Sequence, residues 1–188
     1  MATIKEAWLA FLVDVELAKH YNQVDVHSRS LAPNPILDAL LPSLLYVRLG
    51  SLLDDFFGDH IINKRLVMPR SYRNDLNGKI SFLNDQSLLK DASKLHGLRL
   101  KRNELAHEAE KSCTWKDLDD ATNDAEAELQ HLGLVGSPPK FEFYAERKPR
   151  ASADPGCFIS FDYCYGLRIN GAKHIEVSWQ QNLNLPGQ

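Results

Sequence analysis

The chain has 188 residues and a mass of 21.3 kDa, with 44% hydrophobic and 25% charged residues. This composition excludes wholesale disorder, and the length suffices to bury a core without a metal or a disulfide. The net charge of −3 is unevenly placed, since residues 63–107 carry 10 basic and 4 acidic side chains, whereas residues 108–130 carry 2 and 8. A basic segment between acidic ones favours local contact with phosphate groups over the wrapping of long duplex DNA. A solvated face of mixed charge is the alternative interpretation.

The cysteines and the apolar segments indicate the compartment. Cys113, Cys157 and Cys164 form no CxxC pair, so we expect neither a disulfide framework nor a zinc site, and we interpret Cys157 and Cys164 as structural. We find no apolar run of the ~18–20 residues that cross a bilayer, and the N-terminal residues lack the apolar core of a secretory signal. We therefore expect a cytoplasmic protein with no cofactor and no membrane partner.

The first part of the chain has the apolar periodicity of helices. Apolar residues at helical spacing predict a first helix from about residue 3 into the twenties. Asn34-Pro35 has the residues of a helix start, and the leucine-rich segment behind it predicts a central helix that ends at Gly58. Pro42 is expected to kink this helix or to mark its true start.

Two further helices are predicted after a long connection. Residues 60–83 show no sustained period and are expected to be an irregular link, of the kind that is often functional or mobile. A third helix is predicted to open near residues 84–85. Thr114 and Asp117 have the spacing of a capping box that starts a last helix, and Gly133 is expected to close it.

The composition changes near residue 136. Three segments rich in aromatic and β-branched residues are predicted to form an antiparallel meander: 141–147, 157–169 and 174–182. Asn170-Gly171 predicts a type I′ hairpin turn, which needs a positive φ at both central residues. We therefore predict a mainly α protein, with an up-and-down bundle of four to five helices over residues 1–135 and a β-rich extension over residues 136–188.

The most informative segment is Arg102-Asn103-Glu104-Leu105-Ala106-His107. It resembles the R-x4-6-H signature of HEPN (higher eukaryotes and prokaryotes nucleotide-binding) domains, in which a polar residue directly follows the arginine, as Asn103 does here. The predicted order of helices agrees with that family, and the resemblance covers about residues 1–135.

The resemblance implies an activity and a set of partners. Many HEPN domains are metal-independent endoribonucleases, often toxins or anti-phage effectors, that work as homodimers with two motifs across one cleft. By this resemblance His107 is the catalytic histidine, Arg102 the phosphate-binding arginine and Asn103 the catalytic polar residue beside it. The expected partners are an RNA substrate (single-stranded or a tRNA loop), a second copy of the chain, and an antitoxin or defence-system protein. Other members lack catalysis and bind nucleotides or proteins, which is the alternative function.

The residue types suit this chemistry independently of the family. RNA cleavage without a metal needs a group that moves a proton near neutral pH, as histidine does, and a cation that binds phosphate oxygens, as a guanidinium does. Four neighbouring cations are candidate substrate-binding residues: Arg70, Arg73, Arg99 and Lys101. Arg65 and Lys79 lie in the predicted link with two of them and either guide RNA or are merely solvated.

Helix geometry constrains the motif. Residues five apart on an ideal helix diverge by ~140° and rise by ~7.5 Å, so Arg102 and His107 would not share a face, whereas Asn103 and His107 would. Either the helix frays at Ala106-His107, or Arg102 acts on the phosphate that the other subunit holds. The alternative is that His107 only caps the last carbonyls of the helix and offsets its dipole.

Three further polar residues are weaker candidates. Asp54 and Asp55 have no third ligand at helical spacing, so we interpret them as a solvated face rather than a metal site. His96 is interpreted as a surface or half-buried residue rather than a second base.

Overall fold

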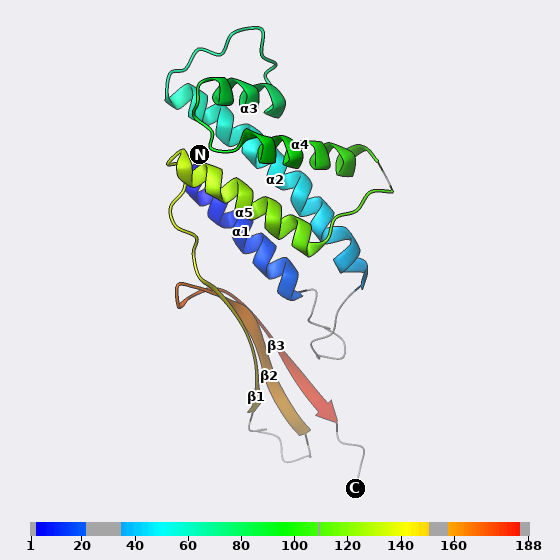
Figure 1. Ribbon diagram of the computed structural model, residues 1–188. Helices are drawn as coiled ribbons and strands as arrows, with labels where there is room; N and C mark the ends of the chain where they lie inside the picture. Colours follow the sequence, from blue (N-terminus) through cyan, green and yellow to red (C-terminus); the bar gives the residue numbers. More distant parts are fainter. Residues whose placement is uncertain (1–2, 22–34, 109, 151–157, 185–188) are drawn as a thin grey trace. The chain divides into compact units, whose positions relative to one another are not determined.

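The computed structural model describes residues 3–21, 35–108, 110–150 and 158–184. The chain divides into two units, Met1–Pro138 and Pro139–Gln188. The first unit is helical and the second is a three-stranded antiparallel sheet (Figure 1). This confirms the predicted mainly α fold with a C-terminal β meander.

The helical unit is built around one long helix. Its elements are α1 (Ile4–Tyr21), α2 (Pro35–Asn63), α3 (Leu76–Asp85), α4 (Ala92–His107) and α5 (Trp115–His131). Helix α2 contacts the four others, as its apolar residues on more than one face predict. The fully buried core includes Phe11, Leu49, Phe57, Ile80, Leu95, Leu118 and Leu129. Each such side chain stabilises the fold by about 1.5–3 kcal/mol relative to an exposed position.

Helix α2 is longer than the sequence suggested. It begins at Pro35 as predicted and contains Pro42 in its interior, so Pro42 does not mark its start. The predicted end at Gly58 is wrong, because the helix continues to Asn63 and still buries Ile61. Gly58 instead leaves room for the Nζ atom of Lys79, which lies 3.2 Å from the position of a Cβ at residue 58.

The same helix is apolar enough to have a second interpretation. Its 29 residues include a window with a mean hydropathy of 1.6, so by length and composition it could cross a bilayer. This corrects the expectation that no run of that length exists. Its contacts with α1, α3, α4 and α5 account for its buried apolar residues, whereas Ile36, Leu40, Leu44 and Ile62 are exposed.

The predicted link over residues 60–83 is the largest error. Half of it is helix, because α2 continues to Asn63 and α3 occupies Leu76–Asp85, which ends where the sequence suggested that a helix begins. Asp75 caps α3 by accepting a hydrogen bond from the N–H of Gly78 at 2.8 Å. Gly78 permits a close approach, since a Cβ there would lie 1.9 Å from the carbonyl oxygen of Arg73. The following helix, α4, starts at Ala92.

Helix α5 forms as predicted. Thr114 and Asp117 make a capping box in which the N–H of Thr114 donates to Asp117 Oδ2 at 2.9 Å. Gly133 follows the helix with a φ of 69°. The buried Glu128 carboxylate of α5 accepts the N–H groups of Lys90 at 3.0 Å and Asp91 at 2.6 Å, which ties the start of α4 to α5.

The second unit is a meander of three strands in the order β1-β2-β3. The strands are β1 (Phe141–Arg150), β2 (Phe158–Ile169) and β3 (Ala172–Asn184). Asn170 and Gly171 have φ values of 51° and 82° between the paired Ile169 and Ala172, as the predicted type I′ turn requires. Cys157 lies outside the described residues, and Cys164 is a half-buried free thiol on β2.

Candidate functional site

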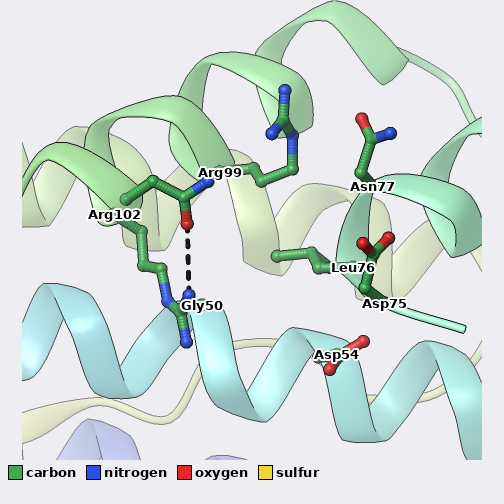
Figure 2. A pocket seen from close by; sticks show the side chains of 8 residues that line it. Gly50, Asp54, Asp75, Leu76, Asn77, Arg99 and Arg102 are labelled. Carbon is green, nitrogen blue, oxygen red and sulfur yellow. Dashed lines mark hydrogen bonds between the residues drawn. The ribbon is translucent and has the colours of Figure 1, made fainter. Parts of the chain in front are cut away.

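Arg102 lies on α4 against a notch in α2. A Cβ at Gly50 would lie 2.8 Å from Arg102 Cγ, so any larger residue at position 50 would displace the arginine. Arg102 Nη1 donates a hydrogen bond to Asn103 Oδ1 at 3.1 Å, drawn as the dashed line in Figure 2. The glycine and the neighbouring amide together fix the direction of the guanidinium.

A hollow of about 160 Å³ opens beside Arg102, between α2, α4 and the start of α3. Its lining residues are Gly50, Asp54, Asp75, Leu76, Asn77, Arg99, Arg102 and Asn103 (Figure 2). The structure therefore brings together three residues that the sequence singled out, namely Arg99, Arg102 and Asn103. In Figure 2 the Arg102 side chain reaches from α4 to α2 and ends beside Gly50, whereas the Arg99 side chain points away from α2 on the side of Asn77.

The two carboxylates of the hollow are already engaged. Asp54 Oδ1 accepts a hydrogen bond from Lys79 Nζ at 2.8 Å, and Asp75 caps α3. The arginines differ, because the Nε atoms of Arg99 and Arg102 are buried and have no hydrogen-bond partner within the described part of the chain. Buried polar groups are nearly always satisfied, so these two donors suit an acceptor that enters the hollow.

His107 lies away from this hollow. It is the last residue of α4 and is exposed. The helix does not fray before it, because the N–H of Glu108 donates to the carbonyl of Glu104 at 2.8 Å. On this regular helix Arg102 and His107 diverge by about 140°, whereas Asn103 and His107 share a face. One chain therefore does not bring Arg102 and His107 together.

The other predicted substrate-binding cations are dispersed. Lys101 lines a separate hollow of about 290 Å³ between α4 and α5, together with Asp117, Asp120 and Asp124. Arg70 and Arg73 are exposed in the link between α2 and α3. These three residues do not share the hollow that Arg99 and Arg102 line.

The remaining candidate residues, Lys79 and His96, pack within the helical unit and do not line the hollow beside Arg102. Lys79 is buried on α3 and paired with Asp54, so it is an internal ion pair rather than a loop residue that guides RNA. Burial and the charge of Arg99 lower the pKa of His96. Among the residues that the structure describes, no group of three or more His, Cys, Asp or Glu side chains could hold a metal.

Sequence reasoning missed Gly50, Asp75 and Asn77. The signal for Gly50 was a glycine inside a leucine-rich helical segment, where glycine is unfavourable by about 0.5–1 kcal/mol relative to alanine. The signal for Asp75 was an aspartate directly before an apolar residue, which is typical of an N-cap. Neither signal identifies the residue across the fold that the glycine accommodates.

No protein-family model, no curated protein and no solved structure matches the chain.

Proposed function

We propose that the protein is a metal-independent endoribonuclease of the HEPN type that cleaves single-stranded RNA or a tRNA loop. The observation that carries the proposal is the environment of Arg102. Its side chain packs against Gly50, takes its orientation from a hydrogen bond to Asn103, and lines a hollow at which two guanidinium Nε donors lack a partner among the described residues. The same helix ends at an exposed histidine, His107. The motif and the helical arrangement support the family, and the helical unit supplies the rigid element that the site needs.

The proposed site is shared between two chains. Arg102 and His107 point about 140° apart on one regular helix. In a symmetric dimer with facing α4 helices, Arg102 of one chain and His107 of the other reach a common cleft. This arrangement favours a homodimer as the active species.

The proposed reaction is an internal transesterification. His107 takes the proton of a ribose 2′-OH, and the 2′-oxygen bonds to the adjacent phosphorus. The bond from phosphorus to the 5′-oxygen breaks and that oxygen takes up a proton, which leaves a 2′,3′-cyclic phosphate and a 5′-hydroxyl. Arg102 donates hydrogen bonds to the phosphate oxygens while negative charge builds on them. Such an activity in a chain of this size suits a toxin or anti-phage effector, whose partner would be an antitoxin or another defence-system protein.

The test is RNA cleavage in excess EDTA. The parent should cleave, and His107→Ala should lower the rate by roughly 10²–10⁴, the usual scale for loss of a general acid or base. Arg102→Ala should also lose rate, and Arg102→Lys should restore little, because an ammonium group cannot replace a planar fork of donors.

A matched control uses the equivalent place on another helix. His131 is the exposed last residue of α5, as His107 is of α4. His131→Ala should cleave at the parental rate. Cleavage that survives His107→Ala would overturn the proposal.

The separation of Arg102 and His107 also defines the competing function. A protein that is monomeric at micromolar concentration cannot unite the two side chains on a regular α4 helix. A monomer that binds RNA or nucleotide without cleaving it would therefore be a non-catalytic binding module.

A further inference from the structure

The hollow beside Arg102 has the size of a phosphate site. Its volume is about 160 Å³, which holds more than one water-sized group. Sites that enclose a whole drug-sized ligand are larger, about 300–1,000 Å³. The hollow therefore admits a phosphate group with its nearest atoms but does not enclose a complete nucleotide.

The charges at the hollow favour an anion. Asp54 is neutralised by Lys79 at 2.8 Å, so the remaining charged groups are Asp75, Arg99 and Arg102. Two guanidinium groups against one carboxylate leave a net positive charge. The Asp75 carboxylate is also occupied as the cap of α3, where it accepts the N–H of Gly78.

One nitrogen of each arginine lacks an acceptor among the described residues. A buried donor without a hydrogen bond costs free energy, and this applies to the Nε atoms of both Arg99 and Arg102. Both side chains therefore become more stable if they turn toward an acceptor that enters the hollow. A phosphate suits this role, because its oxygens accept charge-assisted hydrogen bonds from a guanidinium group.

We propose that this hollow is a second phosphate subsite, which binds a phosphate of the RNA strand other than the one that is cleaved. Arg99 is its principal residue, and Arg102 links it to the scissile phosphate. The inference rests on the proposed function in taking RNA as the ligand. It adds that the protein holds the strand at two phosphates and thereby sets the position of the cut.

The experiment measures RNA binding without cleavage. Single-stranded RNA is titrated against His107→Ala protein at several salt concentrations, with and without Arg99→Gln. Loss of one phosphate contact on a single strand should reduce the slope of log K against log salt by about 0.7. The affinity at low salt should fall about tenfold, the effect of losing one charge-assisted hydrogen bond. Arg99→Lys keeps the charge and should keep most of the salt slope. That result would show that the effect of Arg99→Gln comes from the lost charge and not from a change in the fold.

The control removes a cation elsewhere. Lys5 is exposed on α1, and Lys5→Gln should leave the slope and the affinity unchanged. Inorganic phosphate alone should raise the unfolding temperature of the parent more than that of Arg99→Gln. A site for a terminal phosphate would bind RNA with a 5′-phosphate more tightly than RNA with a 5′-hydroxyl. A site for a phosphate within the strand would bind the two equally.

The outcomes separate this inference from the proposed function. An Arg99-dependent salt slope in a protein that never cleaves RNA upholds the subsite and overturns the nuclease. Equal slopes for Arg99→Gln and Lys5→Gln overturn the subsite, whatever the cleavage assay gives. Displacement of the RNA by an acidic peptide through Arg99 would also overturn it and assign the hollow to a protein carboxylate.

Discussion

The Cγ atom of Arg102 lies 2.8 Å from the position that a Cβ atom of residue 50 would occupy, so Arg102 packs directly against Gly50 in the space that a larger side chain would fill. The two residues belong to different helices, α2 and α4, which pack against each other. A glycine in the middle of α2 destabilises the helix slightly, and the close passage of Arg102 accounts for its presence. The position of the phosphate-binding arginine in the proposed site therefore depends on a residue that is distant in the sequence.

Substitution of Gly50 tests that relationship. Gly50→Ala places a methyl group against Arg102 Cγ and should move the guanidinium, so RNA cleavage should fall at least tenfold. The fold should persist, because the overpacking cost of about 1–3 kcal/mol is offset by about 1 kcal/mol of helix propensity. Cleavage rates and circular dichroism measure the two effects separately.

Gly97→Ala is the matched control. Gly97 lies in α4, and a Cβ there would meet nothing within 4 Å. This variant should keep parental cleavage and gain up to about 1 kcal/mol in the free energy of unfolding. Equal activity of the two alanine variants would show that Gly50 does not position Arg102.

The Lys79–Asp54 pair should contribute to stability. Lys79 Nζ donates to Asp54 Oδ1 at 2.8 Å and to the Asp54 carbonyl at 2.9 Å, and Lys79 is 9% exposed. Lys79→Met should lower the free energy of unfolding by about 1–3 kcal/mol, toward the low end because the Asp54 side chain is 36% exposed and can hydrate. A double-mutant cycle with Asp54→Asn in urea unfolding isolates the pair. Additive effects of the two substitutions on the free energy of unfolding would contradict a stabilising interaction between Lys79 and Asp54.

Histidine burial should make the helical unit less stable in mild acid. His60 is 3% exposed on α2, and its pKa lies below the ordinary value because of burial and, to a lesser degree, the charge of Lys64. The folded state then binds fewer protons than the unfolded state once the pH falls below about 6.5. The free energy of unfolding should therefore be constant above that pH, decline as the pH falls, and level off below the folded-state pKa.

His60→Gln should weaken this decline without abolishing it, since burial also lowers the pKa of His20 and His96. Urea unfolding between pH 7.5 and 5 measures the slope, and His131→Gln is the exposed control. A slope that is the same in both variants would mean that His60 is protonated equally in the folded and unfolded states.

The sheet should depend on Gly166. A Cβ there would lie 2.2 Å from the Ile175 carbonyl oxygen and 2.7 Å from the Tyr144 hydroxyl. Gly166→Ala should therefore destabilise the second unit by about 1–3 kcal/mol, seen as faster amide exchange in β2 and β3. Gly136→Ala, where a Cβ would meet nothing within 4 Å, should leave that exchange unchanged.

Local signals in the sequence predicted local structure well. The Asn170-Gly171 turn and the Thr114–Asp117 capping box are confirmed because each depends on residues at most three apart. Helix α3 was missed because it is only ten residues long and has an Asn-Gly pair in its first turn. The close approach of Gly78 to the Arg73 carbonyl explains why glycine occurs there, and nothing in the local pattern reveals it.

The site was predictable only in part. The motif located Arg102, Asn103 and His107 on one helix, and the structure confirms that helix. The seat at Gly50 and the hollow with Arg99 depend on contacts between α2, α3 and α4, which no spacing along α4 contains. Conversely, the basic side chains of Arg70, Arg73 and Lys101 were grouped by their closeness in sequence, and the fold separates them from the hollow.

The most direct test of the shared site is complementation between two inactive variants. Arg102→Ala and His107→Ala proteins, differently tagged, are mixed under conditions of subunit exchange, and RNA cleavage is measured in EDTA. Each mixed dimer should hold one site with both residues intact, so a random mixture should recover about a quarter of the parental activity, whereas either variant alone is inactive. Mixed dimers that form but remain as inactive as their parents would contradict a site built from Arg102 of one chain and His107 of the other.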